Sequence, residues 1–393
     1  MFVSTRTGFR AGQEDIALSL RFEKKKKACA AVLDGHGGVV VAQDLATKLK
    51  AMGEIPRMQE HEICQEWNES LKIHKKGGST MVVGCVDVQH NLARFTWVGD
   101  GCAFVFDSST GELAIADKMT EYDQADPRKT FSEVHVPAVI QPHAFCGVFK
   151  KRTNPMPTSI TKYMPHAASM LKTVEMKHDT KKEDGLLELA RMITLHGKQN
   201  YETCESVDRC KLRRHGREHE HRAIMSLVEP SRSFGDFIVY EKMPMWHPVA
   251  IPTTREFTFS SPTDPYVMFL ATDGILSNGC FKSPDEIAFF LSFPLDGLKQ
   301  KNIHTPELVQ DKYEECLQEH ETLASRRAQR SKMSAQQLQT MWGEEAKNAR
   351  ATVLAFLARI HQKPTWQQKV HLLTAAALLL SSVDNVTAIV LPF

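Results

Sequence analysis

The sequence lacks any apolar run long enough to cross a membrane. The longest, Leu372–Leu380 with Thr374 inside it, falls far short of the roughly 20 residues that a membrane-spanning helix needs. The N-terminus, which reads M-F-V-S-T-R, has no apolar signal core, and Phe2 excludes N-myristoylation. These absences predict a soluble protein that is neither secreted nor bound to a membrane.

A disulfide framework and a strong excess of one charge are also missing. The nine cysteines show no even, closely spaced pattern and no C-x-x-C pair, which favours a reducing compartment: the cytoplasm, the nucleus or both. The formal net charge is only +2, so nothing in the composition points to nucleic acid as a partner. The 393 residues are 42% hydrophobic and 24% charged, which is typical of a globular protein with a substantial core.

What the sequence does have is a short segment that combines a strand pattern with reactive side chains. Residues 30–38 read A-A-V-L-D-G-H-G-G. The apolar run Ala30–Leu33 predicts a buried strand that ends at Asp34, and the glycines let the backbone turn and approach a ligand closely. Asp34 could then bind a hard cation, and His36 could give a proton to a leaving group. A plain Asp-Gly turn with a surface histidine is the alternative interpretation.

The residues before this segment predict a hairpin with four lysines, Lys24–Lys27, at its tip. The tip is interpreted as a solvated turn, with a nuclear signal as the alternative. A hairpin brings together the residues that flank its open end. We therefore expect three charged residues to lie near Asp34 and His36: Arg10, Glu14 and Asp15.

Apolar spacing predicts the other elements of the core. Helices are expected at 39–52, 63–73, 284–291 and 367–382, and one long or two shorter helices at 305–360. Short apolar runs predict antiparallel sandwich strands at 79–88, 93–98, 102–107, 113–115, 266–271 and 386–391. Gly99–Asp100–Gly101 is interpreted as a tight turn between two of these strands, with a structural role for its aspartate.

Residues 121–222 differ from the rest of the chain in composition. Lys, Arg, His, Pro and Thr dominate 137–180, and hydrophobic alternation is weak, which indicates an insertion or an extended flap. Its function is open between a substrate-selecting element and a solvated excursion. Five possible ligands fall close together there, but their spacing matches no common zinc finger, so no zinc site is expected: Cys204, Cys210, His215, His219 and His221.

Three separate strand ends repeat the same design. Asp34, Asp273 and Asp384 each stand at the end or start of an apolar strand beside a Gly or an Asn, and Glu14–Asp15 adds two more carboxylates. Each could be a simple turn residue. Gathered at one end of a sandwich, however, these acids would repel one another unless cations neutralise them. A ligand set of oxygens alone favours Mg²⁺ or Mn²⁺ over zinc.

In their order along the chain, these motifs resemble those of the metal-dependent Ser/Thr protein phosphatases of the PPM (type 2C) family. The matching segments are G-F-R-A-G-Q-E-D, V-L-D-G-H-G-G, G-S-T, G-D-G, P-S-R-S-F-G-D-F, L-A-T-D-G-I and D-N-V-T-A-I-V-L, which span Thr7 to Leu391. The resemblance implies an α+β fold, an α-β-β-α sandwich of two antiparallel sheets flanked by helices, with a metal site at one end. It implies one catalytic domain over residues 1–393, with insertions at about 121–222 and 295–365, acting on phosphorylated proteins. We expect a monomer.

The resemblance also implies a role for individual residues. Arg10 would bind the substrate phosphate, and His36 would protonate the leaving alkoxide while a metal-activated water attacks phosphorus. Asp34 would bridge two ions, Mg²⁺ or Mn²⁺, with the Gly35 carbonyl beside it. The other implied metal ligands are Asp273 and Asp384 on one ion, Glu14 on the other with Asp15 in support, and Asp117 on a third, weaker ion.

The chain also departs from the family pattern. Gly101–Cys102 stands where the family usually has Ser-Arg, Lys118 where a His is common, and Ser277 where it often has Asp. The Asp that Ser277 replaces belongs near the third metal, so this replacement weakens the case for that ion. A catalytically weak scaffold that binds partners, a pseudophosphatase, is the alternative function. A phosphohydrolase of small phosphate esters is a third reading, without a positive feature. The retention of Glu14 and the three strand-end aspartates favours the enzyme.

Overall fold

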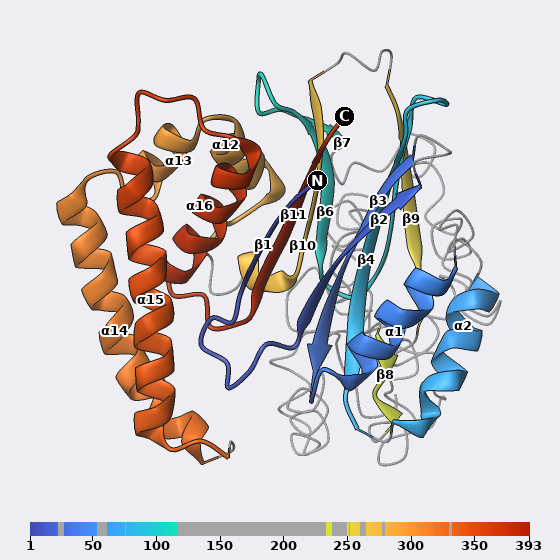
Figure 1. Ribbon diagram of the computed structural model, residues 1–393, viewed down its shortest axis with the longest axis horizontal. Coiled ribbons are helices and arrows are strands. Elements are labelled where there is room, and N and C mark those ends of the chain that lie inside the picture. Colours follow the sequence, from blue (N-terminus) through green and yellow to red (C-terminus); the bar gives the residue numbers. More distant parts are fainter. Residues whose placement is uncertain are drawn as a thin grey trace, which may run out of the picture.

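The computed structural model describes residues 1–22, 27–52, 61–74, 76–115, 233–237, 250, 252–259, 265–276, 280–329 and 332–393. Within these ranges the chain forms two antiparallel sheets packed face to face, with helices on both outer faces (Figure 1). The α+β, two-sheet fold implied by the sequence is therefore confirmed. The flap at 121–222 and three of the four lysines predicted at the hairpin tip, Lys24–Lys26, lie outside the described residues, whereas Lys27 begins a strand.

The first sheet has five strands in the order β1-β11-β10-β6-β7, and every pairing is antiparallel. Its strands are β1 (Phe2–Arg6), β11 (Val386–Pro392), β10 (Tyr266–Ala271), β6 (Cys102–Asp107) and β7 (Leu113–Ile115). The sequence predicted all of these except β1, which pairs with the C-terminal strand from Phe2 opposite Val390 to Arg6 opposite Val386.

The second sheet runs in the order β2-β3-β4-β5-β9, with the short β8 paired to β4. Its strands are β2 (Asp15–Phe22), β3 (Lys27–His36), β4 (Gly78–Asp87), β5 (Leu92–Val98), β9 (Thr253–Thr258) and β8 (Phe234–Gly235). β2 and β3 form the predicted hairpin. The segment Gly99–Gly101 connects two predicted strands, β5 of this sheet and β6 of the other.

Strand β3 lies at the centre of the molecule and is buried on both faces. Ala30 and Val32 belong to the large core between the sheets, whereas Ala31 and Leu33 belong to a second core beneath α1 (Val40–Ala51). Because both faces are apolar, the strand reads as a continuous run rather than as an alternation. It also continues through Asp34 to His36, past the predicted end.

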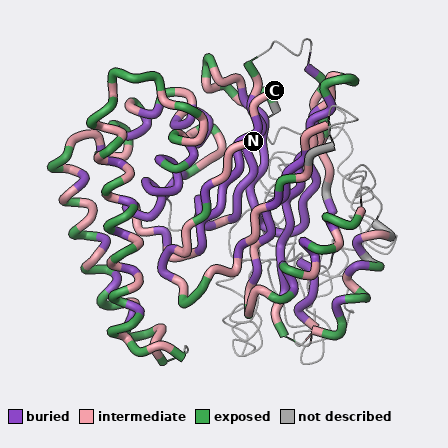
Figure 2. Tube along the Cα trace, in the orientation of Figure 1, coloured by how far each residue is buried: buried purple, intermediate pink, exposed green. Residues whose placement is uncertain are grey.

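Helices cover the two outer faces (Figures 1 and 2). α1, α2 (His61–Ser70) and the short η2 (Leu71–Ile73) lie on the side of the second sheet. The C-terminal helices lie on the side of the first sheet: α12 (Pro284–Ser292), α13 (Pro294–Gln300), α14 (Pro306–Ala328), α15 (Ala335–Leu357) and α16 (Trp366–Leu379). α16 packs on β1 and β11, and α14 and α15 form an antiparallel hairpin outside it. None of the described helices has both the length and the apolar character needed to cross a bilayer.

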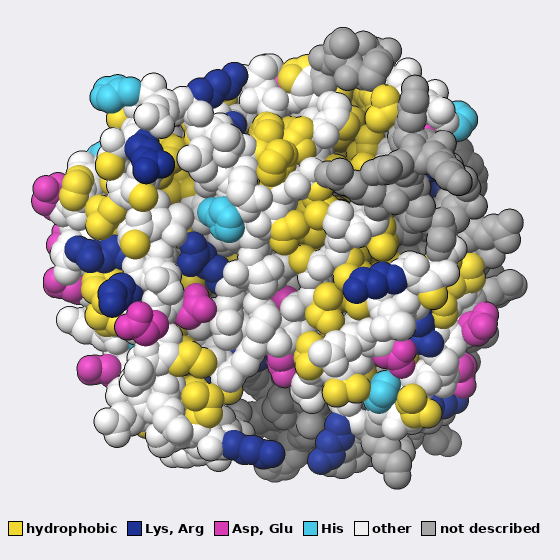
Figure 3. All heavy atoms as spheres, viewed as in Figure 1, with side chains coloured by type: hydrophobic (Ala, Val, Ile, Leu, Met, Phe, Trp, Pro, Cys, Tyr) yellow, Lys and Arg dark blue, Asp and Glu magenta, His cyan; other side chains and the backbone are white. Residues whose placement is uncertain are grey.

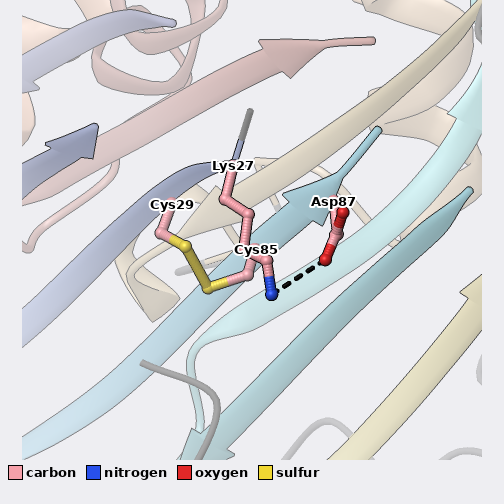
Figure 4. Close-up of a disulfide and its surroundings, with 4 residues drawn as sticks. All are labelled: Lys27, Cys29, Cys85 and Asp87. Atoms are coloured by element: carbon pink, nitrogen blue, oxygen red, sulfur yellow. Dashed lines mark ion pairs between the residues drawn. A yellow bond between two sulfur atoms is a disulfide. The ribbon is translucent and has the colours of Figure 1, made fainter. Parts of the chain in front are cut away.

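One cysteine pair departs from the expectation of a chain without disulfides. Cys29 and Cys85 face each other in the register of β3 and β4 and are joined by a disulfide across 56 residues of sequence (Figure 4). The next pair along the same face, Lys27 and Asp87, forms an ion pair at 2.8 Å. The sequence could not predict the bond, because the pairing follows from strand register rather than from cysteine spacing.

Candidate functional site

The strand register brings the predicted site residues to one end of the sandwich. Asp15 at the start of β2 lies opposite Asp34 near the end of β3. In the other sheet, β10 ends just before Asp273, and β11 begins just after Asp384. The loop between β1 and β2, residues 7–14, connects the two sheets at this end. We refer to the four aspartates named here as the acidic cluster.

The acidic cluster is strongly repulsive. Burial, followed by the charges of Asp384 and Asp273, raises the pKa of Asp15 to about 8, although a hydrogen bond from Thr272 to its Oδ2 opposes the shift. Burial and the three other aspartates likewise raise the pKa of Asp34 well above its usual range. These carboxylates cannot all be ionised at neutral pH unless a cation compensates them.

Arg10 supplies part of that compensation. Its Nη2 donates to Oδ2 of Asp384 in an ion pair, and the charges of Asp384, Asp34 and Asp273 raise the pKa of Arg10 against the opposing effect of burial. Its Nε is buried and has no hydrogen-bond partner among the described residues. The planar guanidinium, with this N–H donor unpaired, can bind two oxygens of an anionic ligand once a cation neutralises the neighbouring carboxylates.

Asn385 fixes the loop that carries Arg10 and Glu14. Its Oδ1 accepts from the backbone N–H of Glu14 at 2.8 Å, and its Nδ2 donates to the carbonyls of Thr7 and Gly12. The Gly35 N–H donates to the Glu14 carbonyl at 3.2 Å, which ties the same loop to β3. Burial raises the pKa of Glu14, while the charge of Arg10 opposes the shift. Glu14 thus lies beside the acidic cluster, as predicted.

His36 has a partner that the sequence did not reveal. Its Nε2 lies 2.8 Å from both carboxylate oxygens of Asp236, and Ser233 Oγ donates to Asp236 Oδ2. Burial opposes the charged ring, but the charge and the hydrogen bond of Asp236 outweigh it and raise the pKa of His36. The pair forms because β8 sits beside the start of β4, with Gly235 opposite Gly78. Asp236 belongs to the segment S-F-G-D-F, which carried the resemblance without an assigned role.

The predicted residues are brought together with one exception. Arg10, Glu14, His36 and the acidic cluster lie at one end of the sandwich, whereas Asp117 falls outside the described residues. Asp100, interpreted from the sequence as structural, lies close enough for its charge to contribute to raising the pKa of Asp34. Its location would have been hard to infer, because the segment around it crosses between the sheets.

The donor set fits Mg²⁺ or Mn²⁺ in its chemistry. The acidic cluster offers only hard oxygens, and Asp15 Oδ1 is buried with no hydrogen-bond partner within the described ranges. In the part of the chain that the structure describes, however, no three His, Cys, Asp or Glu side chains are grouped so as to hold an ion. Arg10 is paired with one of the carboxylates, so a bound cation would compete with it for Asp384.

No protein-family model and no curated protein sequence matches this chain. Among solved structures, a sex-determining protein of C. elegans is 15% identical with a TM-score of 0.43; the match covers 99% of this chain and 63% of that one, less than two thirds of its length. The serine-threonine phosphatase 2C of Toxoplasma gondii is 12% identical with a TM-score of 0.39, over 100% and 93% of the two chains. The catalytic domain of the phosphatase PstP, solved with two manganese ions, is 12% identical with a TM-score of 0.40, over 99% and 95%. These TM-scores are low, so the description of the fold rests on the strand order of this chain's own two sheets.

Proposed function

We propose that this protein hydrolyses phosphoserine and phosphothreonine in proteins, with Mg²⁺ or Mn²⁺ as cofactor. The observation that carries the proposal is the convergence of the acidic cluster with Arg10 and the His36–Asp236 pair at one end of the sandwich. Such a site offers hard oxygens for a cation, a guanidinium for phosphate and a proton donor for a leaving group. The order of sequence motifs resembling the PPM family supports the same reaction.

The cation would be held by carboxylates of the acidic cluster and Glu14, with the Gly35 carbonyl beside Asp34. When bound, it acidifies a water molecule for attack on phosphorus and neutralises charge on the phosphate. Release of Asp384 from Arg10 would then free the guanidinium. Arg10 could donate from Nε and Nη to two phosphate oxygens, which orients the group and balances its charge.

His36 would supply the proton that the serine or threonine alkoxide needs to leave. Its pairing with Asp236 favours the protonated imidazolium. With the Nε2 proton donated to the Asp236 carboxylate, the proton on Nδ1 is the one available for transfer. The ring would therefore act as a general acid, and Asp236 as the residue that orients it.

The test is the hydrolysis of a phosphothreonine peptide by the full chain, with and without Mn²⁺ and after EDTA treatment. We expect turnover to depend on the metal, and Asp34→Asn to lower kcat by about a thousandfold or more. Full turnover after exhaustive EDTA treatment would contradict the proposal. Asp311→Asn, at an exposed position on α14, is the matched control.

A second readout does not depend on activity. Added Mn²⁺ should raise the melting temperature of the wild-type chain, because it binds the folded state and relieves repulsion in the acidic cluster. Asp34→Asn should remove most of that rise, whereas Asp311→Asn should retain it. An equal rise in all three proteins would mean that the metal binds elsewhere.

The alternative is a catalytically weak binding protein with the same fold. The replacements at Gly101–Cys102 and Ser277 favour it, since they alter motifs that the family usually retains. This alternative predicts a folded chain that binds a phosphopeptide without turning it over, with Mn²⁺ present. Release of inorganic phosphate, measured directly, distinguishes the two functions.

A further inference from the structure

The α14–α15 hairpin lies against the loop that carries Arg10. In sequence it belongs to the predicted helical insertion at about 295–365, and its first residue, Pro306, comes 296 residues after Arg10. Its outer surface carries Lys, Arg, Asp and Glu side chains interspersed with one another, as the left side of Figure 3 shows. Its inner surface instead carries buried residues, Trp342 among them. The contacts between the hairpin and the loop that carries Arg10 are therefore made from its inner surface.

Three hydrogen bonds run from the hairpin to backbone carbonyls beside Arg10 and Asp384. Trp342 Nε1 donates to the Arg10 carbonyl at 3.1 Å. Arg327, in the last turn of α14, donates from Nη1 to the Phe9 carbonyl and from Nη2 to the Val383 carbonyl at 3.2 Å. One guanidinium thus joins the residue before Arg10 to the residue before Asp384. Two of the five N–H donors of Arg327 are therefore engaged with main-chain carbonyls on either side of the Arg10–Asp384 pair.

Aromatic packing reinforces these bonds. Phe9 of the loop is fully buried against the hairpin. The centroid of its ring lies 3.3 Å from that of His320 and 5.8 Å from that of Trp342. The Arg327 guanidinium lies 5.9 Å from the centre of the Trp342 ring. Burial, followed by the charge of Arg10, lowers the pKa of Arg327. The loop is therefore held from the hairpin on one side and by Asn385 on the other.

We propose that Arg327 and Trp342 are positioning residues, and that through them the α14–α15 hairpin sets the affinity of Arg10 for a phosphate group. The inference rests on the proposed function, because it takes the Arg10 guanidinium as the phosphate-binding group. The hydrogen bonds fix the main chain on both sides of the Arg10–Asp384 pair. Loss of either anchor would let the guanidinium occupy positions from which it cannot reach two phosphate oxygens.

The test uses Trp342→Phe, which retains the ring and removes the N–H, and Arg327→Lys, which retains the charge but cannot join two carbonyls. With Mn²⁺ present, each should raise KM for a phosphothreonine peptide, and the inhibition constant of inorganic phosphate, by about threefold to tenfold. The change in kcat should be smaller, because the acid and the acidic cluster are not displaced. Arg326→Met, at the exposed neighbouring position, and Trp366→Phe are the matched controls.

A double-mutant cycle separates positioning from general destabilisation. In an Arg10→Ala background, Trp342→Phe should leave KM unchanged, since the group that it positions is gone. An effect of full size in that background would overturn the inference, as would single variants that behave like Arg326→Met. Failure of the proposed function looks different: the wild-type chain would neither hydrolyse the peptide nor bind inorganic phosphate, and both proposals would fall. Melting temperatures establish that each variant is folded.

Discussion

The two sides of the site are supported in opposite ways. On the side of Arg10, the α14–α15 hairpin supports the backbone with large side chains, chiefly Trp342. On the side of His36, strands β4 and β8 approach closely because Gly78 has no side chain. A Cβ added to Gly78 would overlap Asp236 Oδ2 and lie 2.5 Å from His36 Nε2. Gly235, opposite Gly78, has φ +82° and donates its N–H to Asn68 at 2.8 Å.

This difference indicates how each side tolerates change. Support by several side chains fails gradually, because each hydrogen bond contributes about 1 kcal/mol and the others remain when one is lost. Support by a glycine at a close approach fails abruptly, because a single added methyl group displaces the polar pair beside it. Substitutions on the Arg10 side should therefore have graded effects, whereas substitutions on the His36 side should have large ones.

The largest effect is expected from Gly78→Ala. The added Cβ would separate His36 from Asp236, so kcat on a phosphothreonine peptide should fall by about a thousandfold. Hydrolysis of para-nitrophenyl phosphate should fall much less, because nitrophenolate leaves without a proton. Steady-state kinetics on the two substrates measures the difference.

Two further variants make that result specific. Asp236→Asn breaks the same pair without adding an atom, and it should show the same preference for the activated substrate. Gly343→Ala, in α15, adds a methyl group where no atom lies within 4 Å, and it should leave both rates as in the wild type. Equal losses on both substrates in Gly78→Ala would argue against His36 as the acid.

The next largest effect is a loss of stability at low pH that comes from His320 in the α14–α15 hairpin. Burial, followed by the charge of Arg327, lowers the pKa of His320 from 6.5 to about 4. The unfolded chain therefore binds more protons than the folded chain between these values, and the free energy of unfolding should fall as pH falls from 6.5 to 4, by up to about 3 kcal/mol from this group. Urea unfolding across this pH range should show a shallower dependence in His320→Leu. His361→Leu, at an exposed position, should retain the wild-type slope.

The smallest effect is expected from a substitution that stabilises the α14–α15 hairpin, on the Arg10 side of the site. Gly343→Ala should raise the free energy of unfolding by roughly 0.5–1 kcal/mol, because alanine loses less backbone entropy in a helix and meets no neighbouring atom. Gly297→Ala in α13 is the counterpart, since its Cβ would lie 2.6 Å from the Phe290 ring and should destabilise the chain. Chemical denaturation measures both. A loss of stability in Gly343→Ala would show that this helix position is more crowded than described.

Local patterns in the sequence were sufficient for most of the fold. The strands at 266–271 and 102–107 read as apolar runs, and the register of the sheets confirms them. β1 and β9 were missed because F-V-S-T-R and T-T-R-E-F-T are mostly polar, and they become strands through their partners β11 and β5. The break between α14 and α15 had a usable signal: Ser334 and Gln337 form a capping box.

The site was less predictable than the fold. The aspartates could be found from the sequence because they stand at strand ends, and strand ends meet at one end of a two-sheet sandwich. Asp15 and Asp34 are direct register partners there. The pairing of His36 with Asp236 joins residues 200 apart through a two-residue strand, and no local pattern encodes it. The contacts of Arg327 and Trp342 are made to carbonyls, which every residue carries. Ligation by the acidic cluster stays a prediction.

The Cys29–Cys85 bond fixes the register of β3 and β4 along their whole length, not only at the two cysteines. From this bond the ladder of β3 and β4 continues without a shift to its last pair, His36 opposite Gly78, about 23 Å away at the usual rise of about 3.3 Å per residue. A slip of one residue would place Gly77 or Ser79 opposite the histidine and turn the side chains of the strand that moved to the other face of the sheet. The disulfide near one end of the β3–β4 ladder therefore specifies which residue lies beside His36 at the other end.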